Sequence, residues 1–142
     1  MSKPNLILIG AGGHVRACID AVEQEGIYKI AGLIGLAQEV GSKQFGYEVI
    51  AADTEMRELA DQYRFALVSI GQIHTAEQRI RLYTQAQNAG FSFPTVIAPS
   101  AYVSSHSTVG IGTIVMHGAI INAGALVGAN CIINSNSLIE HD

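Results

Sequence analysis

The sequence predicts a fold of two parts, a small Rossmann-like parallel α/β domain over residues 1–95 and an incomplete left-handed parallel β-helix over residues 96–142. In the first part, short apolar runs alternate with amphipathic stretches, which is the order of strands and helices around a parallel sheet. In the second part, a large aliphatic residue recurs at every sixth position. A chain of 142 residues has room for one ordinary core and a short appended module.

The first half of the chain supplies the elements of a parallel sheet. Asn5 to Ile9 is an apolar run that stops at Gly10, as expected for a strand buried on both faces. The next stretch has apolar residues at i, i+3, i+4 and i+7 and predicts an amphipathic helix that ends at Gly26. Further strands are expected at 28–34, 48–50 and 65–70, and further helices at 54–61 and 76–89. This order predicts parallel strands with right-handed crossovers.

A glycine-rich turn, GAGGH, lies between the first strand and the first helix, from Gly10 to His14. Parallel α/β sheets bind ligands at the carboxyl ends of their strands, glycines admit a ligand close to the backbone, and helix N–H groups can hold a phosphate. A nucleotide or nucleotide-sugar is therefore a candidate ligand. The structural alternative is a turn whose glycines only join strand to helix.

Two departures from the dinucleotide fingerprint count against NAD as the ligand of this turn. Val15 stands where the pattern G-x-G-x-x-G has its third glycine. The second strand ends in AGLIG, without the acid that would bind a ribose hydroxyl.

The second half of the chain has a strict six-residue period. A large aliphatic residue occupies one position of each unit, and a small residue lies two positions before it. A period of six is neither helical nor alternating, so each unit is predicted to form one short strand and one bend, with three units to a triangular coil. A flexible linker would need no periodic Val or Ile. The inward residues are Val103, Val109, Val115, Ile121, Val127, Ile133 and Ile139, and the small ones are Ala101, Ser107, Thr113, Ala119, Ala125, Cys131 and Ser137.

Composition excludes several function classes. The net charge of −4 and the lack of any Lys/Arg cluster argue against a nucleic-acid partner. No apolar run is long enough to span a membrane and the N-terminus lacks a leader pattern, which predicts a cytoplasmic protein. Cys18 and Cys131 are isolated thiols without metal-like spacing, so no metal site is expected.

His141 is a candidate for chemistry because it follows the inward Ile139 by two residues, at a bend that faces outward. An imidazole there can take a proton from an attacking amine or hydroxyl, and Glu140 or Asp142 could fix its tautomer. His117 has the same place in the repeat, so the register alone does not distinguish a catalytic from a solvated histidine. We interpret His117 as a surface or subunit-interface residue.

Five segments together resemble the sialic-acid and bacillosamine acetyltransferases of the NeuD/PglD type, which act in bacterial surface-sugar synthesis. They cover nearly the whole chain and are LILIGAGGHVR, VGSKQFGYEVI, ALVSIGQ, VIAPSAYVS and NSNSLIEHD. The resemblance implies a homotrimer that transfers an acetyl group directly from acetyl-CoA to an amine or hydroxyl of a sugar, often a nucleotide-activated one.

The same resemblance implies roles for individual residues. His141 matches the family's general base, and Asp142 matches the acid that polarises it. Two departures bear on the nucleotide: Gln72 stands where an asparagine is usual, and Ile34 and Gly35 stand where the family often has acids. The residues that match the family's substrate-binding positions are Gly10, Gly12, Gly13, His14, Gly71 and Gln72.

Members of this family continue for several coils after the EHD motif, and those coils form the acetyl-CoA groove with a neighbouring subunit. The chain is therefore expected to be a fragment that lacks most of the acetyl-CoA site and has no turnover. Two other hypotheses stay open. One is a nucleotide-sugar-binding module in which the β-helix is only an oligomerisation stalk and His141 is incidental. The other is an NAD-dependent oxidoreductase.

Overall fold

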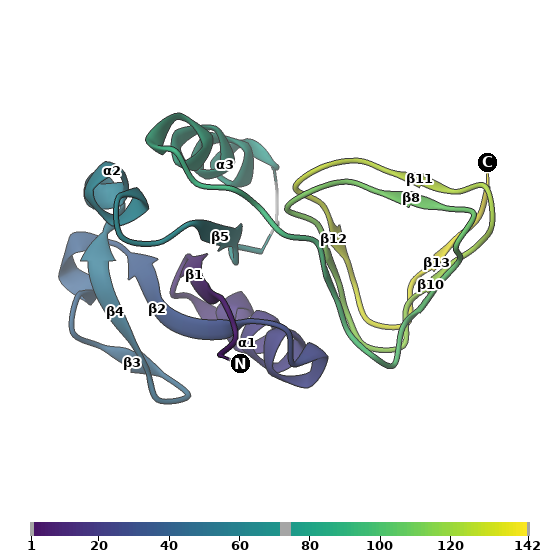
Figure 1. Ribbon diagram of the computed structural model, residues 1–142, viewed down its shortest axis with the longest axis horizontal. Coiled ribbons are helices and arrows are strands. Elements are labelled where there is room, and N and C mark those ends of the chain that lie inside the picture. Colours follow the sequence, from purple (N-terminus) through teal and green to yellow (C-terminus); the bar gives the residue numbers. More distant parts are fainter. Residues whose placement is uncertain (1, 72–74, 142) are drawn as a thin grey trace.

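The computed structural model describes residues 2–71 and 75–141. It consists of a Rossmann-like α/β domain and a triangular β-helix beside it (Figure 1). The domain has a five-stranded sheet of order β3-β4-β2-β1-β5, and every strand pair of the β-helix is parallel. The predicted fold class, a small Rossmann-like domain followed by a short parallel β-helix, is confirmed.

Helices cover both faces of the central sheet, which is why its inner strands are continuously apolar. α1 (Gly13–Glu25) packs on one face, and α2 (Met56–Ala60) and α3 (Glu77–Ala89) pack on the other. α1 ends at Gly26 and α3 at Gly90, both in the left-handed conformation that stops a helix. The parallel strands are β1 (Asn5–Ile9), β2 (Lys29–Gly35), β4 (Tyr47–Ala52) and β5 (Phe65–Val68).

The edge of the sheet differs from the all-parallel prediction. A short strand, β3 (Lys43–Gln44), pairs antiparallel with β4 through a turn at Phe45 and Gly46. Both turn residues have positive φ, 49° and 86°, which is the backbone of a tight hairpin. Phenylalanine is an unusual residue there, so no turn signal marked the hairpin. The helix expected over 54–61 is also divided, into the 3-10 turn η2 (Asp53–Glu55) and α2.

The β-helix is built from two-residue strands that stack on three faces. Each strand pairs with the third strand after it, giving the faces β6-β9-β12, β7-β10-β13 and β8-β11. The seven aliphatic residues that the period predicted to point inward all belong to one core cluster. The strands are β6 (Val96–Ile97), β7 (Tyr102–Val103), β8 (Thr108–Val109), β9 (Ile114–Val115), β10 (Ile120–Ile121), β11 (Leu126–Val127), β12 (Ile132–Ile133) and β13 (Leu138–Ile139).

Left-handed residues at successive corners recur every six residues from Gly112 to Asn136 and support the period. Glycine adopts this conformation without cost, and asparagine does so more readily than most residues. The corner residues, with their φ angles, are Gly112 (73°), Gly118 (71°), Gly124 (85°), Asn130 (54°) and Asn136 (62°).

The two parts of the chain share a hydrophobic core. The side of α1 that faces away from the sheet contacts the β-helix face that begins with β6, so one cluster of buried residues runs from the sheet into the β-helix. This cluster fixes how the two parts sit against each other. Its members from α1 include Val15, Cys18, Ile19 and Val22, and those from the β-helix are Val96, Ala98, Ile114 and Met116.

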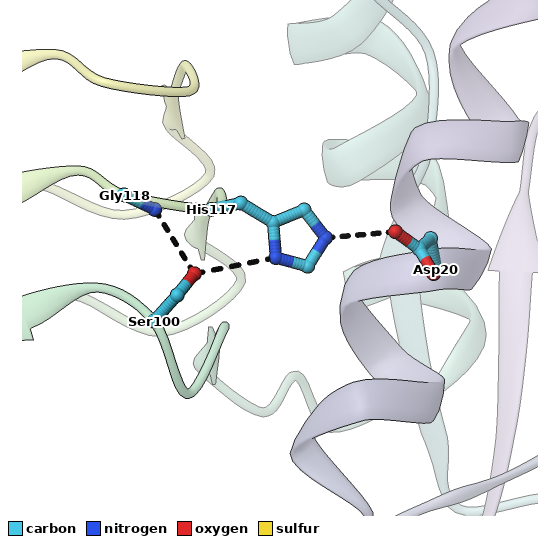
Figure 2. Close-up of polar contacts among 4 residues, drawn as sticks. All are labelled: Asp20, Ser100, His117 and Gly118. Atoms are coloured by element: carbon cyan, nitrogen blue, oxygen red, sulfur yellow. Dashed lines mark hydrogen bonds and ion pairs between the residues drawn. The ribbon is translucent and has the colours of Figure 1, made fainter.

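A histidine at the rim of this interface links the two parts by polar contacts (Figure 2). His117 Nε2 lies 2.8 Å from Asp20 Oδ2 on α1, and its Nδ1 lies 3.4 Å from Ser100 Oγ. His117 is therefore placed between two parts of its own chain. A second polar contact joins the same two parts, because the backbone N–H of Ile97 in β6 donates to Glu25 Oε2 of α1 at 2.9 Å.

Candidate functional site

The carboxyl ends of the parallel strands open into a cavity of about 1080 Å³. Its walls are the glycine turn after β1, the segments that follow β2, β4 and β5, the beginning of α3, and the β-helix at Ile132 and Asn134. Parallel α/β sheets bind their ligands at this edge, and the volume suits a ligand of nucleotide size. The β-helix wall was not expected from the sequence, because the domain was predicted to bind its ligand by itself.

The glycines of the turn after β1 differ in what the fold requires of them. Gly10 has a φ of 126°, and a Cβ atom there would lie 2.6 Å from Ile70 Cγ1. A Cβ at Gly12 or Gly13 would meet no atom within 4 Å, and neither residue has a positive φ. Only Gly10 is therefore explained by the joining of strand to helix. Glycine at the next two positions leaves the backbone open to a ligand in the cavity.

His14 lies in the first turn of α1 and lines the cavity. Its ring packs on Gly71, where an added Cβ would lie 3.3 Å from His14 Cβ and 3.4 Å from Cγ. Burial, with a further contribution from the positive charge of Arg79, lowers the pKa of His14 below its ordinary 6.5. Its Nε2 is buried without a hydrogen-bond partner among the described residues. His14 is thus an uncharged imidazole with one nitrogen available to a ligand.

Two acids that the sequence analysis did not assign also line the cavity. Glu39 lies in the 3-10 turn η1 (Ala37–Glu39) after β2, where its Oε1 accepts a hydrogen bond from the Leu36 N–H at 2.7 Å. Asp53 follows the end of β4. The end of β2 itself has no acid, as the sequence shows, but Glu39 lies four residues further on and reaches the cavity. Val15, at the position of the third glycine of the dinucleotide pattern, is fully buried.

The sequence held different signals for these two acids. Asp53 is the first polar residue after an apolar strand, a position that parallel sheets often use for ligands, and it could have been found. The 3-10 turn after β2 brings the Glu39 side chain back beside the strand end, and no periodic pattern in the sequence indicates such a turn.

The residues predicted to bind the substrate lie at the cavity, apart from one that the structure does not describe. Gly10, Gly12, Gly13, His14 and Gly71 all line the cavity. Gln72 and Asp142 lie outside the described residues.

His141 is exposed and follows β13, which lies on the face of the triangle that points away from the Rossmann-like domain (Figure 1). A Cβ at Gly124, one coil earlier, would lie 3.1 Å from His141 Cβ. A single chain does not bring His141 to the lining of the cavity.

The contacts of Ser100, His117 and Asp20 have the order of a hydrolytic triad, but they serve to join the β-helix to α1. The Asp20 carboxylate can only accept a hydrogen bond, so Nε2 of His117 carries the proton and Nδ1 accepts from the Ser100 hydroxyl. The same hydroxyl oxygen accepts from the Gly118 N–H at 3.1 Å. The His117 and Asp20 side chains are 36% and 54% exposed, and none of the three residues lines the cavity described above.

Within residues 2–71 and 75–141, no helix has the length and apolar character that crossing a bilayer requires. In the same residues, the side chains of His, Cys, Asp and Glu do not gather into a group of three or more that could hold a metal ion.

Comparison with known proteins places these features in context. The family model of the PglD N-terminal domain matches residues 5–85. PerB from Caulobacter crescentus, solved in complex with CoA and GDP-perosamine, is 30% identical with a TM-score of 0.88; the alignment covers 99% of this chain and 65% of that one.

The acetyltransferase domain of PglB from Neisseria gonorrhoeae, in complex with acetyl coenzyme A, is 26% identical with a TM-score of 0.85, over 99% of this chain and 66% of that one. The chain therefore spans just under two thirds of the length of these structures. A comparison with curated proteins gave no match.

Proposed function

This chain belongs to the PglD N-terminal domain family, and from that premise we propose that it serves an acetyltransferase that moves an acetyl group from acetyl-CoA to a nucleotide-activated sugar. The observation that carries the proposal is the cavity. Gly12 and Gly13 leave its backbone open to a ligand, although the fold has space for a side chain at both positions. Further support comes from PerB, solved with CoA and GDP-perosamine, and from the PglB domain, solved with acetyl coenzyme A. The acceptor is an amine or hydroxyl of the sugar, in cytoplasmic synthesis of bacterial surface glycans.

The cavity suits the diphosphate of a nucleotide sugar, although no cationic side chain of its described lining pairs with the phosphates. The described lining residues include no lysine or arginine, so the N–H groups at the start of α1 hold the diphosphate, helped by the helix dipole. His14 Nε2 offers one further hydrogen bond. The carboxylates of Glu39 and Asp53 accept hydrogen bonds from ribose hydroxyls or from the N–H groups of a base.

His141 acts as the general base in this proposal. Its imidazole removes a proton from the sugar amine or hydroxyl as that atom attacks the carbonyl carbon of the acetyl thioester. The new N–C or O–C bond forms, the C–S bond breaks, and CoA leaves with the electron pair of that bond. To Asp142, which lies outside the described residues, we assign the stabilisation of the imidazolium, as a carboxylate does beside a catalytic histidine.

A homotrimer brings the base and the cavity together. His141 does not line the cavity of its own chain, and the preceding strand β13 lies on the face that points away from the domain, so the base for each cavity comes from a neighbouring copy. Tyr102, Ile120 and Leu138 lie in register on the outer face β7-β10-β13 and are 59%, 41% and 57% exposed. An apolar strip of this kind favours burial against another protein surface. We assign this strip, called here the outer strip, to the contact between copies.

Substitutions in the outer strip are expected to weaken the trimer. The double variant Ile120→Ser with Leu138→Ser removes two apolar side chains, each contributing about 1.5–3 kcal/mol when fully buried. Light scattering should therefore find trimers of the wild-type chain and mostly monomers of the variant at the same concentration. Ile80→Ser, which changes an exposed isoleucine of α3 away from the strip, should leave the trimer intact. A wild-type chain that stays monomeric at every concentration contradicts the assignment.

Alanine substitutions at Gly12 and Gly13 test the ligand site directly. The free energy of unfolding should change by less than about 1 kcal/mol, because the added methyl groups meet nothing in the folded chain. Nucleotide-sugar affinity should fall about tenfold or more, because the same methyl groups occupy the space that the phosphates need. Calorimetric titration with UDP-, GDP- and CMP-linked sugars and with NADH measures this. The control is Gly128→Ala, because Gly128 does not line the cavity and a Cβ there would meet only Cys131 Sγ, at 4.0 Å. Binding of NADH alone would favour the oxidoreductase hypothesis instead.

A further inference from the structure

A buried arginine lies behind the cavity and holds the end of β5. Arg79, in the first turn of α3, is only 2% exposed. Its Nη1 donates to the carbonyl oxygens of Val68 at 3.0 Å and Ile70 at 2.9 Å. The residue between them, Ser69, donates from its hydroxyl to the Gly10 carbonyl oxygen at 2.9 Å. One side chain therefore orders the strand end that forms a wall of the cavity.

The same arginine also contacts the β-helix. Its Nε donates to the carbonyl oxygen of Asn130 at 2.9 Å, and the Asn130 side chain returns a hydrogen bond to the Arg79 carbonyl at 3.4 Å. Asn130 is the left-handed corner residue between β11 and β12. Because β12 and the residues after it line the cavity, Arg79 aligns two of its walls.

The charge of Arg79 is not required by these packing contacts. Among the described residues, no carboxylate lies within ion-pair distance of it, and its Nη2 is buried without a partner. The three carbonyl oxygens that accept from Arg79 require hydrogen-bond donors, which a neutral amide also supplies, whereas a buried charge without a counterion is costly. A functional reason for the charge is therefore to be sought nearby.

His14 is linked to Arg79 through the backbone, because its ring packs on Gly71, the residue after Ile70, whose carbonyl oxygen Arg79 holds. Burial is the main cause of its lowered pKa, and the charge of Arg79 acts in the same direction. Its place at the helix N-terminus also disfavours a cation. Glu39 and Asp53 line the same cavity and would favour a protonated ring, yet the net shift is downward. Cys18, one turn later on α1, is neutral, since burial raises the pKa of its thiol to about 12.

We propose that Arg79 is a positioning residue for the cavity, which aligns the end of β5 with the β-helix and keeps His14 an uncharged hydrogen-bond partner for the ligand. The identity of the ligand rests on the proposed function, whereas the state of His14 does not. Phosphate is then held by backbone N–H groups, and His14 adds a directional hydrogen bond rather than a charge. The lowered pKa leaves a smaller fraction of His14 protonated between pH 6.5 and pH 8 than in an ordinary histidine, so nucleotide affinity depends less on pH over that range.

The state of His14 is tested without any ligand. The imidazole resonances of His14, assigned by comparison with His14→Gln, are followed by NMR as the pH changes. The titration midpoint should lie below 6.5 in the wild-type protein and remain below it in Arg79→Lys, which keeps the charge. It should move upward in Arg79→Gln, which removes the charge. Asn130→Gly keeps the left-handed corner, removes only the asparagine side chain, and should leave the midpoint unchanged.

Two results of this titration would overturn the proposal. One is a wild-type midpoint at or above 6.5, which needs no variant and so does not depend on whether Arg79→Gln folds. The other is the same midpoint in wild type and in folded Arg79→Gln.

The effect on the ligand is measured with GDP and UDP as probes, by calorimetry at pH 6 and pH 8. For whichever probe binds the wild-type protein, the dissociation constants at pH 6 and pH 8 should differ less than they do for Arg79→Gln. The terminal phosphate of the probe also titrates at about pH 6, and this contribution is the same for both proteins. Arg79→Gln should bind about tenfold more weakly at pH 8, because the strand end loses its charged donors. It should bind more tightly at pH 6 than at pH 8, because a protonated His14 then attracts the diphosphate. Adding His14→Gln to this variant should abolish that added pH dependence.

The outcomes separate this inference from the proposed function. If neither nucleotide binds the wild-type protein while His14 titrates as expected, the proposed function fails and the role of Arg79 toward His14 stands. If a nucleotide binds and folded Arg79→Gln shows no more pH dependence than the wild-type protein, the role of Arg79 is refuted and the proposed function is untouched.

Discussion

Gly110→Ala is expected to disrupt the β-helix, whereas Gly128→Ala, at the same corner one coil later, should be tolerated. A Cβ at Gly110 would lie 2.5 Å from the carbonyl carbon of Gly128 and 2.6 Å from the backbone nitrogen of Ala129. These are backbone atoms of the next coil, which cannot rotate away. A Cβ at Gly128 would meet only Cys131 Sγ, at 4.0 Å. Neither glycine has a positive φ, so the difference is one of space alone.

The expected cost of Gly110→Ala is about 3 kcal/mol or more, at the upper end for overpacking, because the two coils must separate to admit the methyl group. The Gly110 N–H would also lose its bond to the Val127 carbonyl oxygen, now 2.9 Å. Urea unfolding followed by circular dichroism measures the free energy of unfolding. Gly128→Ala should change it by less than about 1 kcal/mol. Equal stabilities of the two variants would mean that the coils stack less closely than described.

His141→Ala is expected to remove most of the acetyl transfer. Loss of a general base costs about 10²- to 10⁴-fold in rate. The dissociation constant of the nucleotide sugar should stay within about twofold, because the cavity that holds the nucleotide is built from other residues. The assay uses a form of the protein that binds acetyl-CoA, and His106→Ala, which changes another exposed histidine of the β-helix, is the control. Full activity of His141→Ala would favour the hypothesis of a binding module with a β-helical stalk.

A mixing experiment tests whether the base and the cavity belong to different copies. Inactive His141→Ala is unfolded and refolded together with Gly13→Ala, and the nucleotide sugar is kept at a concentration too low to fill the weakened cavity of Gly13→Ala. Mixed trimers contain interfaces with an intact cavity from one copy and an intact His141 from its neighbour, so part of the activity should return. A mixture that stays inactive although mixed trimers form would show that both groups act within one chain.

The β-helix could be predicted because its signals are local and repeated. Each unit places an aliphatic residue inside, and the corners from Gly112 to Asn136 are left-handed, so both signals recur at six residues whatever the rest of the chain does. α1 followed from its own amphipathic pattern and from Gly26. The hairpin at β3 escaped prediction because its turn uses Phe45 at a φ of 49°, a conformation that the residue type does not indicate.

α3 illustrates the limit of pattern reading. Its Arg79 is 2% exposed while the adjacent Ile80 is 57% exposed, the reverse of what their polarities suggest. The reason is that α3 lies over the end of β5, where carbonyl oxygens and the Asn130 corner offer acceptors that only a long cationic side chain reaches. Those acceptors come from segments far apart in the sequence.

The sequence by itself determined the class of each half, the place of the glycine turn and the inward residues of the β-helix, since these depend on neighbours along the chain. Tertiary structure alone decided which side chains share the cavity. Strand order β4-β2-β1-β5 brings Asp53, Glu39, the glycine turn and Gly71 to one edge, and the shared core with α1 sets Asn134 opposite them. It also decided that His141 lies away from them, because the direction of a corner depends on how the whole coil packs against the domain.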